Sequence, residues 1–337
     1  MKKRTIMLIT LPLLALSACA PIAPSSETSS SQEPSIPSLE PMTGNYNKVI
    51  SPSGAPAICF YDQALTGNFD TNSTPSNVAA QLLTDNYGMV VFDFYNGLKS
   101  IKNNNADFKL ARILTGGNLY LVGIDKTTAP TSDDTIVSFG QNLLPDLAYK
   151  KLYSQDIIDN TTYVNAVTDA AAVLASGVYE GENVDYVLIA QPVLFATITN
   201  QNAPTYGRLT VIESLRDKWK ETYNQDAIPQ AGLFVHNDYY EANREYFETQ
   251  FALLDERIDT AINDVITVKN TMDEQIPDLN DQKAFFGFNS NVAKNVQDNA
   301  STPNGFALVS ADEAENIDIQ AFLNTIGVNE DYSDYIL

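Results

Sequence analysis

Short runs of large apolar residues, each followed by a turn and a helical pattern, constrain the fold of this chain more than any other feature. Met89–Phe92 is apolar throughout, and so is Tyr186–Ala190. Runs of four or five such residues are typical of strands buried on both faces. Their alternation with helical segments predicts an α/β fold with a largely parallel sheet.

Other segments continue this alternation. We expect further strands over residues 109–115, 119–124, 135–139, 162–166, 209–211, 230–235 and 306–309. We expect helices over residues 77–87, 144–153, 169–176 and 212–223, and an almost continuous helix over 238–272. Thr168 and Gly177 are favourable cap residues for the helix that they flank.

The first 19 residues have the pattern of a lipoprotein signal. Basic residues 2–4 precede an apolar run over residues 6–16, which is shorter than the roughly 20 residues that span a bilayer. The run closes on Leu-Ser-Ala-Cys, which resembles the lipobox of bacterial lipoproteins. This resemblance implies a signal peptide over residues 1–18 and a diacylglycerol on Cys19. The alternative is a plain signal peptide followed by a chance cysteine.

Residues 19–45 are predicted to be a disordered tether. Five prolines and seven serines stand among few large apolar residues, so the segment cannot bury enough surface to offset its ordering entropy. A flexible chain of this length spans roughly 25–30 Å. No later segment is apolar enough to cross a bilayer, so the lipid is the only membrane anchor expected. The folded part should lie at the extracytoplasmic face of the membrane.

Composition narrows the class of partner. The formal charge is −22, and it becomes −25 once the three basic residues of the signal are removed. Nucleic acid is excluded as a partner, because its binding needs Lys and Arg against phosphates. Cys59 is the one cysteine besides Cys19, so no disulfide is expected. It lies in an apolar run and should be a small buried hydrophobe.

Four segments occur in an order that resembles the extracytoplasmic solute-binding proteins of ABC importers. They are Ser51–Pro56, Phe94–Gly97, Ser138–Gln141 with Pro145-Asp146, and Val184–Pro192. The similarity covers roughly residues 47–255 and is greatest to the type II branch that includes receptors for nitrate, sulfonates and thiamine precursors. It implies the type II periplasmic-binding-protein fold, with two α/β lobes, two hinge crossings and a ligand cleft between the lobes.

Mapped onto this chain, the resemblance implies a lobe I of residues 46–117 and 206–337, and a lobe II of residues 118–205. Gly116 and Gly117 fit the outgoing hinge, because a hinge needs residues that absorb changes in φ and ψ. A tight hairpin at this glycine pair is the competing interpretation. Receptors of this family look mostly monomeric, which implies a monomer here.

Ligands of open α/β sheets bind beyond the carboxyl ends of the strands, where four turns of this chain offer polar groups. The polar groups of these turns are backbone N–H groups, a hydroxyl and side-chain amides, and one turn adds an aromatic face. The candidate ligand-binding residues are Ser53, Gly54, Ala55, Tyr95, Asn96, Gly97, Gly140, Gln141, Asn142 and Gln191. The set includes no Arg or Lys, so we expect a small polar or aromatic-ring solute. Taken singly, each turn is also explained by ordinary turn chemistry.

The inventory of reactive residues argues against an enzyme. His236 is the only histidine, and its position between a strand and a helix suits a packing or capping residue. Neither a Gly-x-Ser-x-Gly elbow nor a phosphate-binding P-loop occurs, and Asp93, Asp146 and Asp185 stand where helix-start or turn acids are expected. No catalytic residue, transition metal or cofactor is predicted.

The sequence therefore predicts a lipid-anchored receptor that closes on a small solute and delivers it to a membrane ABC permease. The alternative is a surface lipoprotein that uses the same two-lobed fold for protein interaction without transport.

Overall fold

The computed structural model describes residues 44–299, 302 and 304–337. The predicted signal peptide, Cys19 and nearly all of the predicted tether lie outside these residues, so those predictions stay predictions. Within the described part of the chain, no helix has both the length and the hydrophobicity that crossing a bilayer requires.

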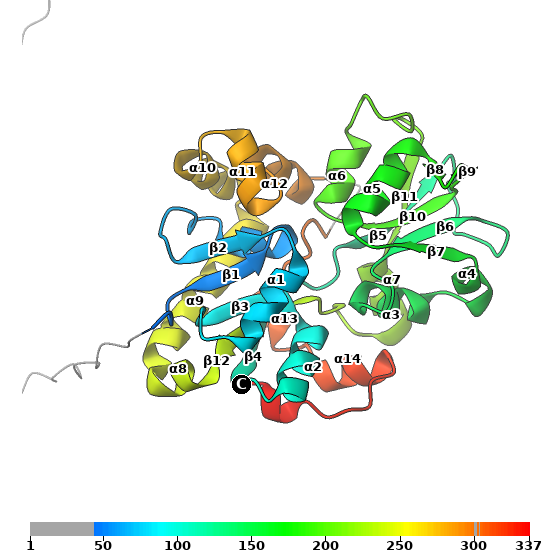
Figure 1. Cartoon of the computed structure of the whole chain (residues 1–337). Coiled ribbons are helices and arrows are strands. Elements are labelled where there is room, and N and C mark those ends of the chain that lie inside the picture. The colour runs from blue at the N-terminus through cyan, green and yellow to red at the C-terminus, as the bar shows by residue number, and fades with distance from the viewer. Residues whose placement is uncertain (1–43, 300–301, 303) are drawn as a thin grey trace, which may run out of the picture. The chain divides into compact units, whose positions relative to one another are not determined.

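A five-stranded sheet forms the centre of what we call lobe I (Figure 1). Its order is β2 (Phe69–Asn72), β1 (Val49–Pro52), β3 (Met89–Asp93), β12 (Ala231–His236) and β4 (Phe108–Ile113). Strands β1, β2 and β3 are parallel, whereas β12 is antiparallel to both of its neighbours.

A second five-stranded sheet forms the centre of lobe II. Its order is β11 (Leu209–Ser214), β5 (Leu119–Ile124), β10 (Tyr186–Ala190), β6 (Ile136–Phe139) and β7 (Thr161–Val164). Strands β10, β6 and β7 are parallel, and β5 is antiparallel to β10 and β11. A short hairpin of β8 (Val178–Tyr179) and β9 (Glu182–Asn183) stands apart from this sheet.

Four of the five strands of each sheet run in the same direction, which agrees with the expected largely parallel sheet, and one strand in each is reversed. That strand is β5 in lobe II and β12 in lobe I. Each is the first strand after the chain has crossed from the other sheet. The crossing delivers the chain to the opposite end of the new sheet, so the arriving strand runs against its neighbours.

Helices cover both faces of the lobe I sheet. The 3-10 helix η1 (Ala55–Phe60) and the helices α9 (Arg244–Asn263), α10 (Val265–Gln275), α11 (Leu279–Phe286) and α12 (Ser290–Gln297) pack on one face. The other face carries α1 (Pro75–Ala79), η2 (Ala80–Leu83), α2 (Phe94–Asn104) and α14 (Ile319–Thr325). The segments α8 (Asn237–Ala242), α13 (Ala311–Ala314) and η3 (Ser333–Tyr335) complete the helices outside lobe II.

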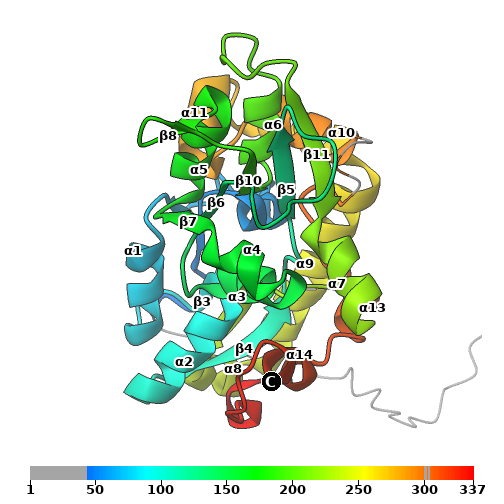
Figure 2. The same ribbon diagram turned by 90° about the vertical axis from the view of Figure 1, so that its right-hand side faces the viewer.

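Lobe II is covered in the same way. Helices α5 (Val167–Ser176) and α6 (Val193–Ile198) pack on one face of its sheet, and α3 (Leu144–Leu152) and α7 (Leu215–Tyr223) on the other. Figure 2 views the chain from the lobe II side, with α3 and the short α4 (Gln155–Asp159) toward the viewer. One apolar cluster includes α2 and α14 as well as α3 and α7, so it joins the two lobes.

Successive side chains of the strands alternate between these layers. In β3, Met89 and Val91 enter the cluster with α9–α12, whereas Val90 enters the cluster with α2. Alternation with period 2 on a sheet covered on both faces explains why such a strand reads as uninterrupted apolar sequence. Cys59 is fully buried in the first of these clusters, as predicted.

The chain passes from the first sheet to the second over residues 114–118 and returns over residues 224–230. The sheet order corrects the predicted return at residue 206, because β11 pairs with β5 and extends lobe II to Ser214. The signal for this boundary was weak, since residues 209–214 are only partly apolar and make an edge strand.

Several predicted helices are shorter than expected. The almost continuous helix over 238–272 is three helices, interrupted at Asn243 and Asp264, where φ is −154° and −142°. The Asp264 carboxylate accepts the Thr267 N–H at 3.2 Å and so caps α10. The predicted helix 212–223 begins only at Leu215, because the residues before it continue β11.

Two further predictions need correction. The predicted helix 77–87 ends at Leu83 after a 3-10 turn, because Thr84 is already extended and its hydroxyl binds the Gln81 carbonyl at 3.2 Å. The predicted strand 306–309 is reduced to an isolated antiparallel bridge between Thr115 and Leu308.

Candidate functional site

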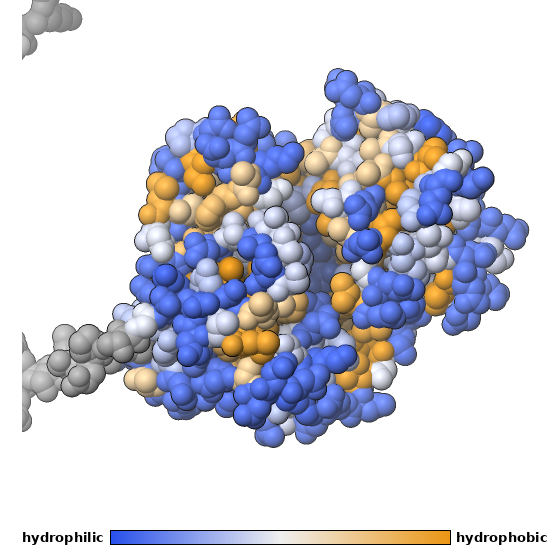
Figure 3. Space-filling model, in the orientation of Figure 1, coloured by the Kyte–Doolittle hydropathy of each residue, from blue (hydrophilic) through white to orange (hydrophobic). Residues whose placement is uncertain are grey.

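The predicted binding turns gather at one edge of each sheet. Strands β1 and β3 are parallel, so the turns at Ser53–Ala55 and Tyr95–Gly97 leave the lobe I sheet on the same side. Strands β6 and β10 are parallel, and they bring Gly140–Asn142 and Gln191 to one side of the lobe II sheet. The surface is hollowed between the lobes, with α1 on one side of the groove and α5 on the other (Figures 1 and 3). The site residues thus form one group on each lobe.

The turn after β1 is bound by helix α11. The Gly54 N–H donates to the Phe286 carbonyl at 2.7 Å, and the Ser53 hydroxyl donates to the Phe285 carbonyl at 3.1 Å. Gly54 has φ +127°, a conformation that favours glycine, while Ala55 is buried. Two donors that were predicted to bind a ligand therefore bind carbonyl groups at the end of α11, more than 200 residues later in the chain.

The turn after β3 is the first turn of α2. The Asp93 carboxylate accepts the Asn96 N–H at 2.8 Å and the Asn96 side-chain amide at 3.2 Å, which makes it the N-cap. Gly97 is required by packing, since a Cβ here would lie 2.3 Å from Cζ of Phe234. The Tyr95 ring meets Tyr332 edge to face at 6.3 Å, so a residue of the C-terminal segment lies beside this turn.

Asp93 is the acidic residue of this turn, and the pKa of its carboxyl is shifted. Burial raises the pKa of its carboxyl to about 6, although the Asn96 hydrogen bonds act in the opposite direction. The carboxylate lies at the start of α2, where the aligned peptide dipoles favour its negative charge.

The turn after β6 presents the most accessible of the predicted groups. Gln141 and Asn142 are exposed, and Gly140 and Asn142 both have positive φ, at +66° and +62°. The Asn142 N–H donates to the buried Asp146 carboxylate at 2.7 Å. The side-chain amides of this turn are therefore its groups available to a solute.

Gln191 is placed at the lobe II edge but is only 2% exposed. Its side-chain oxygen accepts the Phe195 N–H at 3.0 Å, and its amide donates to the Thr302 hydroxyl at 3.2 Å. Its carbonyl accepts the Asn118 side chain at 2.7 Å. Gln191 thus joins β10 to α6, to the first crossing and to a segment near the C-terminus.

The glycine pair lies where the chain crosses between the sheets, and the two crossings are hydrogen-bonded to each other. The Ile228 N–H donates to the Gly116 carbonyl at 3.0 Å, and the Gln230 N–H to the Thr115 carbonyl at 2.9 Å. Gly117 has φ +109°. The hairpin interpretation is excluded, because β4 and β5 belong to different sheets.

A third segment runs beside the crossings. The Gly116 N–H donates to the Ala307 carbonyl at 2.6 Å, and the Val309 N–H donates to the Leu114 carbonyl at 3.0 Å. Further along, Glu313 forms an ion pair with Arg216 of α7. Burial lowers the pKa of the Arg216 guanidinium. We call residues 304–313 the hinge strap.

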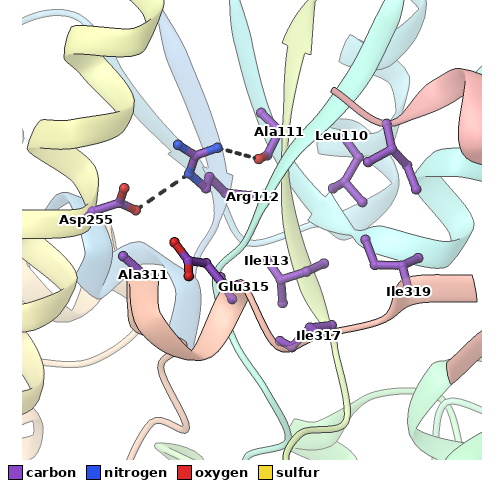
Figure 4. A pocket seen from close by; sticks show the side chains of 11 residues that line it. Leu110, Ala111, Arg112, Ile113, Asp255, Ala311, Glu315, Ile317 and Ile319 are labelled. Atoms are coloured by element: carbon purple, nitrogen blue, oxygen red, sulfur yellow. Dashed lines mark hydrogen bonds and ion pairs between the residues drawn. The ribbon is translucent and has the colours of Figure 1, made fainter. Parts of the chain in front are cut away.

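Two cavities lie at other places in the fold. One of about 390 Å³ adjoins β4, with a wall of Ile113, Ile317 and Ile319 (Figure 4). In it, Arg112 donates to the Ala111 carbonyl at 2.9 Å, and its Nε lies 3.7 Å from the Asp255 carboxylate. The other, of about 550 Å³, is polar and adjoins the hinge strap. The predicted site residues line neither cavity.

His236 is buried at the end of β12, where its ring stacks on Tyr239 at 4.4 Å. Its Nε2 lies 3.1 Å from the Asp85 carboxylate. This placement fits the predicted packing role. Among residues 44–299, 302 and 304–337, no group of three or more His, Cys, Asp or Glu side chains is arranged to hold a metal ion.

Sequence reasoning missed the distant partners that bind the residues of these turns. The α11 carbonyls, Thr302 and the hinge strap reach the site from residues 285–313, beyond the part of the chain that carried the resemblance. The Asp93 cap was detectable, because an acid directly before a helical pattern is a common start signal.

Comparison with known proteins supports the fold. No protein-family model matches the chain, and no curated protein matches its sequence. Among solved structures, an ABC transporter protein from Parabacteroides distasonis is similar, with a TM-score of 0.61 and 16% identity over 86% of this chain and 98% of its own.

Two sulfonate-binding proteins have the same architecture. The periplasmic aliphatic sulphonate-binding protein SsuA from Escherichia coli has a TM-score of 0.55 and 13% identity. The alkanesulfonate-binding SsuA from Xanthomonas axonopodis pv. citri, bound to MOPS, has a TM-score of 0.53 and 10% identity. Each similarity covers 86% of this chain and 96% of the other. The chain therefore has the two-lobed α/β fold of periplasmic binding proteins.

Proposed function

We propose that this protein is the solute receptor of an ABC importer, held at the extracytoplasmic face of the membrane by a lipid on Cys19. It captures a small polar or aromatic-ring solute in the groove between the lobes. Closure about the two crossings then presents the loaded receptor to a membrane permease. The protein acts as a monomer and carries out no chemistry on the solute.

The two adjacent crossings carry this proposal. The chain passes between the lobes twice, and the two crossings lie side by side. A ligand that contacts both lobes would stabilise a closed arrangement by its differential affinity for it. The exposed amides of Gln141 and Asn142 on one lobe and the Tyr95 ring on the other are suitable contacts for a polar or aromatic solute.

Thermal shift against a broad metabolite library tests the binding step. A receptor should be stabilised in proportion to the logarithm of ligand concentration above Kd. A hit should lose affinity about tenfold or more in a Gln141→Ala/Asn142→Ala variant and keep it in Gln320→Ala, a polar truncation on α14. A library that moves the melting temperature of neither wild type nor control argues against a receptor.

Small-angle scattering with the same hit tests closure. The radius of gyration should fall when the solute is added at saturating concentration. If the solute binds and the scattering does not change, binding does not close the lobes, and the closure step of the proposal is wrong.

The anchor can be tested independently in cells. A Cys19→Ser variant should move from the membrane fraction to the soluble extracytoplasmic fraction, whereas Cys59→Ser should remain with the membrane. Retention of Cys19→Ser at the membrane would refute lipid attachment at this residue.

The second candidate function is protein interaction without transport. It is favoured by the turn after β1 and by Gln191, whose donors are engaged within the chain. If the protein functions by protein interaction, we expect that no solute will close the lobes and that a partner protein will co-purify with the wild-type protein.

A further inference from the structure

The cavity beside β4 adjoins a gap in the pairing of this strand, which is an edge strand of the lobe I sheet. On the outer edge, the Leu110 carbonyl accepts the Leu337 N–H at 3.0 Å, and the Leu114 carbonyl, just beyond β4, accepts the Val309 N–H at 3.0 Å. Among the described residues, no strand other than β12 pairs with the backbone between them, residues 111–113. The cavity has a volume of about 390 Å³, which is within the range of small-molecule sites.

The lining of the cavity is divided between apolar and charged side chains. Figure 4 shows the charged group toward one side of the view and the apolar group toward the other. The charged group consists of Arg112, Asp255 and Glu315, and the apolar group of Leu110, Ile317 and Ile319. Both signs of charge therefore stand near one end of a cavity whose other end is aliphatic.

The charged side chains are incompletely paired. Arg112 donates through Nη1 to the Ala111 carbonyl at 2.9 Å, and its guanidinium lies 4.8 Å from the centre of the Phe251 ring. Its Nε is 3.7 Å from the Asp255 carboxylate, which is longer than a hydrogen bond. Within the described part of the chain, Nη2 of Arg112 has no hydrogen-bond partner and Glu315 has no ion-pair partner. The cavity thus retains a donor for an anion and acceptors for a cation.

The environment of Asp255 favours a second cation. Burial raises the pKa of its carboxyl, Arg112 acts in the opposite direction, and the nearby Asp259 adds to the rise. The single guanidinium therefore does not offset the desolvation of this carboxylate and the repulsion from its neighbour. An ammonium group held by Asp255 and Glu315 would supply the missing positive charge.

We propose that this cavity is a second binding site, separate from the groove between the lobes, for a branched-chain amino acid. The carboxylate of the ligand binds Arg112, and its ammonium group binds Asp255 and Glu315 through charge-assisted hydrogen bonds. Its aliphatic side chain is buried against Ile317 and Ile319. The inference does not rest on the proposed receptor function, because no predicted groove residue lines the cavity.

Calorimetric titration of the purified protein with L-leucine tests the site. Three analogues each lack one part of this ligand: isoamylamine lacks the carboxylate, isocaproate lacks the ammonium group, and glycine lacks the aliphatic side chain. L-Leucine should bind about tenfold or more tightly than each analogue, because each loses a charge-assisted hydrogen bond or the apolar contact. Absence of L-leucine binding, or equal binding of an analogue, overturns the inference.

Two variants test whether the ligand lies in this cavity. Arg112→Gln should weaken L-leucine about tenfold without weakening isoamylamine, which has no carboxylate. Glu315→Gln, at an exposed position, should weaken L-leucine and isoamylamine but not isocaproate. The matched control Asp312→Asn removes an exposed acid of α13 that does not line this cavity, and it should bind L-leucine as wild type does. Glu315→Gln decides alone if Arg112→Gln does not fold, and wild-type affinity in Glu315→Gln refutes the site.

The groove variant Gln141→Ala/Asn142→Ala separates this inference from the receptor function. It should keep wild-type affinity for L-leucine. Loss of L-leucine binding in that variant, with full binding in Glu315→Gln, would place the amino acid in the groove; this result refutes the second site and supports the receptor function. A protein that closes on another solute and does not bind L-leucine likewise refutes the second site alone.

Discussion

At the residue scale, the Asp93 side chain connects a sequence pattern with helix capping and electrostatics. It ends β3, caps α2 and stands at the lobe I edge of the groove. Burial raises the pKa of its carboxyl to about 6, so the folded state holds a proton more tightly than the unfolded state. Such a group destabilises the fold increasingly as pH rises from about 4 to about 6.

Asp93→Asn should remove this pH dependence. The amide keeps a capping oxygen, while the desolvation of a negative charge is lost. Relative to wild type, the variant should gain roughly 1–2 kcal/mol of unfolding free energy between pH 4 and pH 7, with the partial exposure of the carboxylate taken into account. Urea unfolding at pH 4, 5 and 7 measures this. The exposed N-cap variant Asp318→Asn is the control, and a difference that shrinks as pH rises would contradict the assignment.

Gly97 gives a second prediction at this scale. Gly97→Ala places a methyl group against the buried Phe234 ring and should destabilise the protein by about 1–3 kcal/mol. In a Phe234→Leu background, which opens space at that contact, the same substitution should be less destabilising. Chemical denaturation of the four proteins of this cycle measures the coupling. Equal effects in both backgrounds would show that the ring is not the obstacle.

At the residue scale, local contacts could be predicted from the sequence, whereas contacts with distant segments could not. The Asp93 cap follows from local pattern, because a cap contacts residues two or three positions away. The engagement of Ser53, Gly54 and Gln191 with α11 and Thr302 does not. Hydrogen bonds between distant segments leave no local pattern, so turn residues that look free in sequence can be satisfied by the fold.

At the scale of elements, interior strands were the most predictable. Strands β3, β10 and β12 lie within a residue of their expected bounds, because burial on both faces gives unbroken apolar runs. Helix lengths were less predictable, since Asn243 and Asp264 interrupt a pattern that stays helical on both sides. Edge strand β11 was partly assigned to a helix, because half-buried residues carry a weaker signal.

Capping of α12 yields the prediction at this scale. The Asn289 side chain accepts the Val292 N–H at 3.0 Å, and the helix buries Ala293 and Val296. Asn289→Ala should therefore reduce stability by about 1 kcal/mol, whereas Asn289→Ser, which keeps a capping oxygen, should lie within a few tenths of wild type. The midpoint of urea unfolding measures both stability changes, provided that the dependence of the unfolding free energy on urea concentration is the same in each variant. Equal losses in the two variants would indicate that packing, not capping, is affected.

At the scale of the described chain, the order of motifs predicted the two-lobed fold correctly, although no single motif did. Gly116 and Gly117, which were predicted to form a hinge, lie where the chain crosses between the sheets. The return crossing was placed too early, and the hinge strap was not anticipated. The hinge strap pairs with residues about 190 positions earlier in the chain, and only the completed fold brings the two segments together.

The Arg216–Glu313 ion pair provides the prediction at this scale, because it fastens the hinge strap to lobe II. Arg216→Ala and Glu313→Ala should each destabilise the protein, and the double variant should lose less than the sum, with a coupling of about 1 kcal/mol. A denaturation cycle at low and high salt measures it. Glu315→Ala, an exposed acid near the same helix, is the control, and additive losses would show that the pair does not act as a unit.

The hinge strap also bears on how the lobes can move. Three chain segments lie edge to edge at the crossings and are joined by backbone hydrogen bonds. Segments joined edge to edge by hydrogen bonds bend more easily across the line of those bonds than within their plane. Relative motion of the lobes should accordingly follow one coordinate, and a single pair of spectroscopic labels, one per lobe, would then suffice to track it.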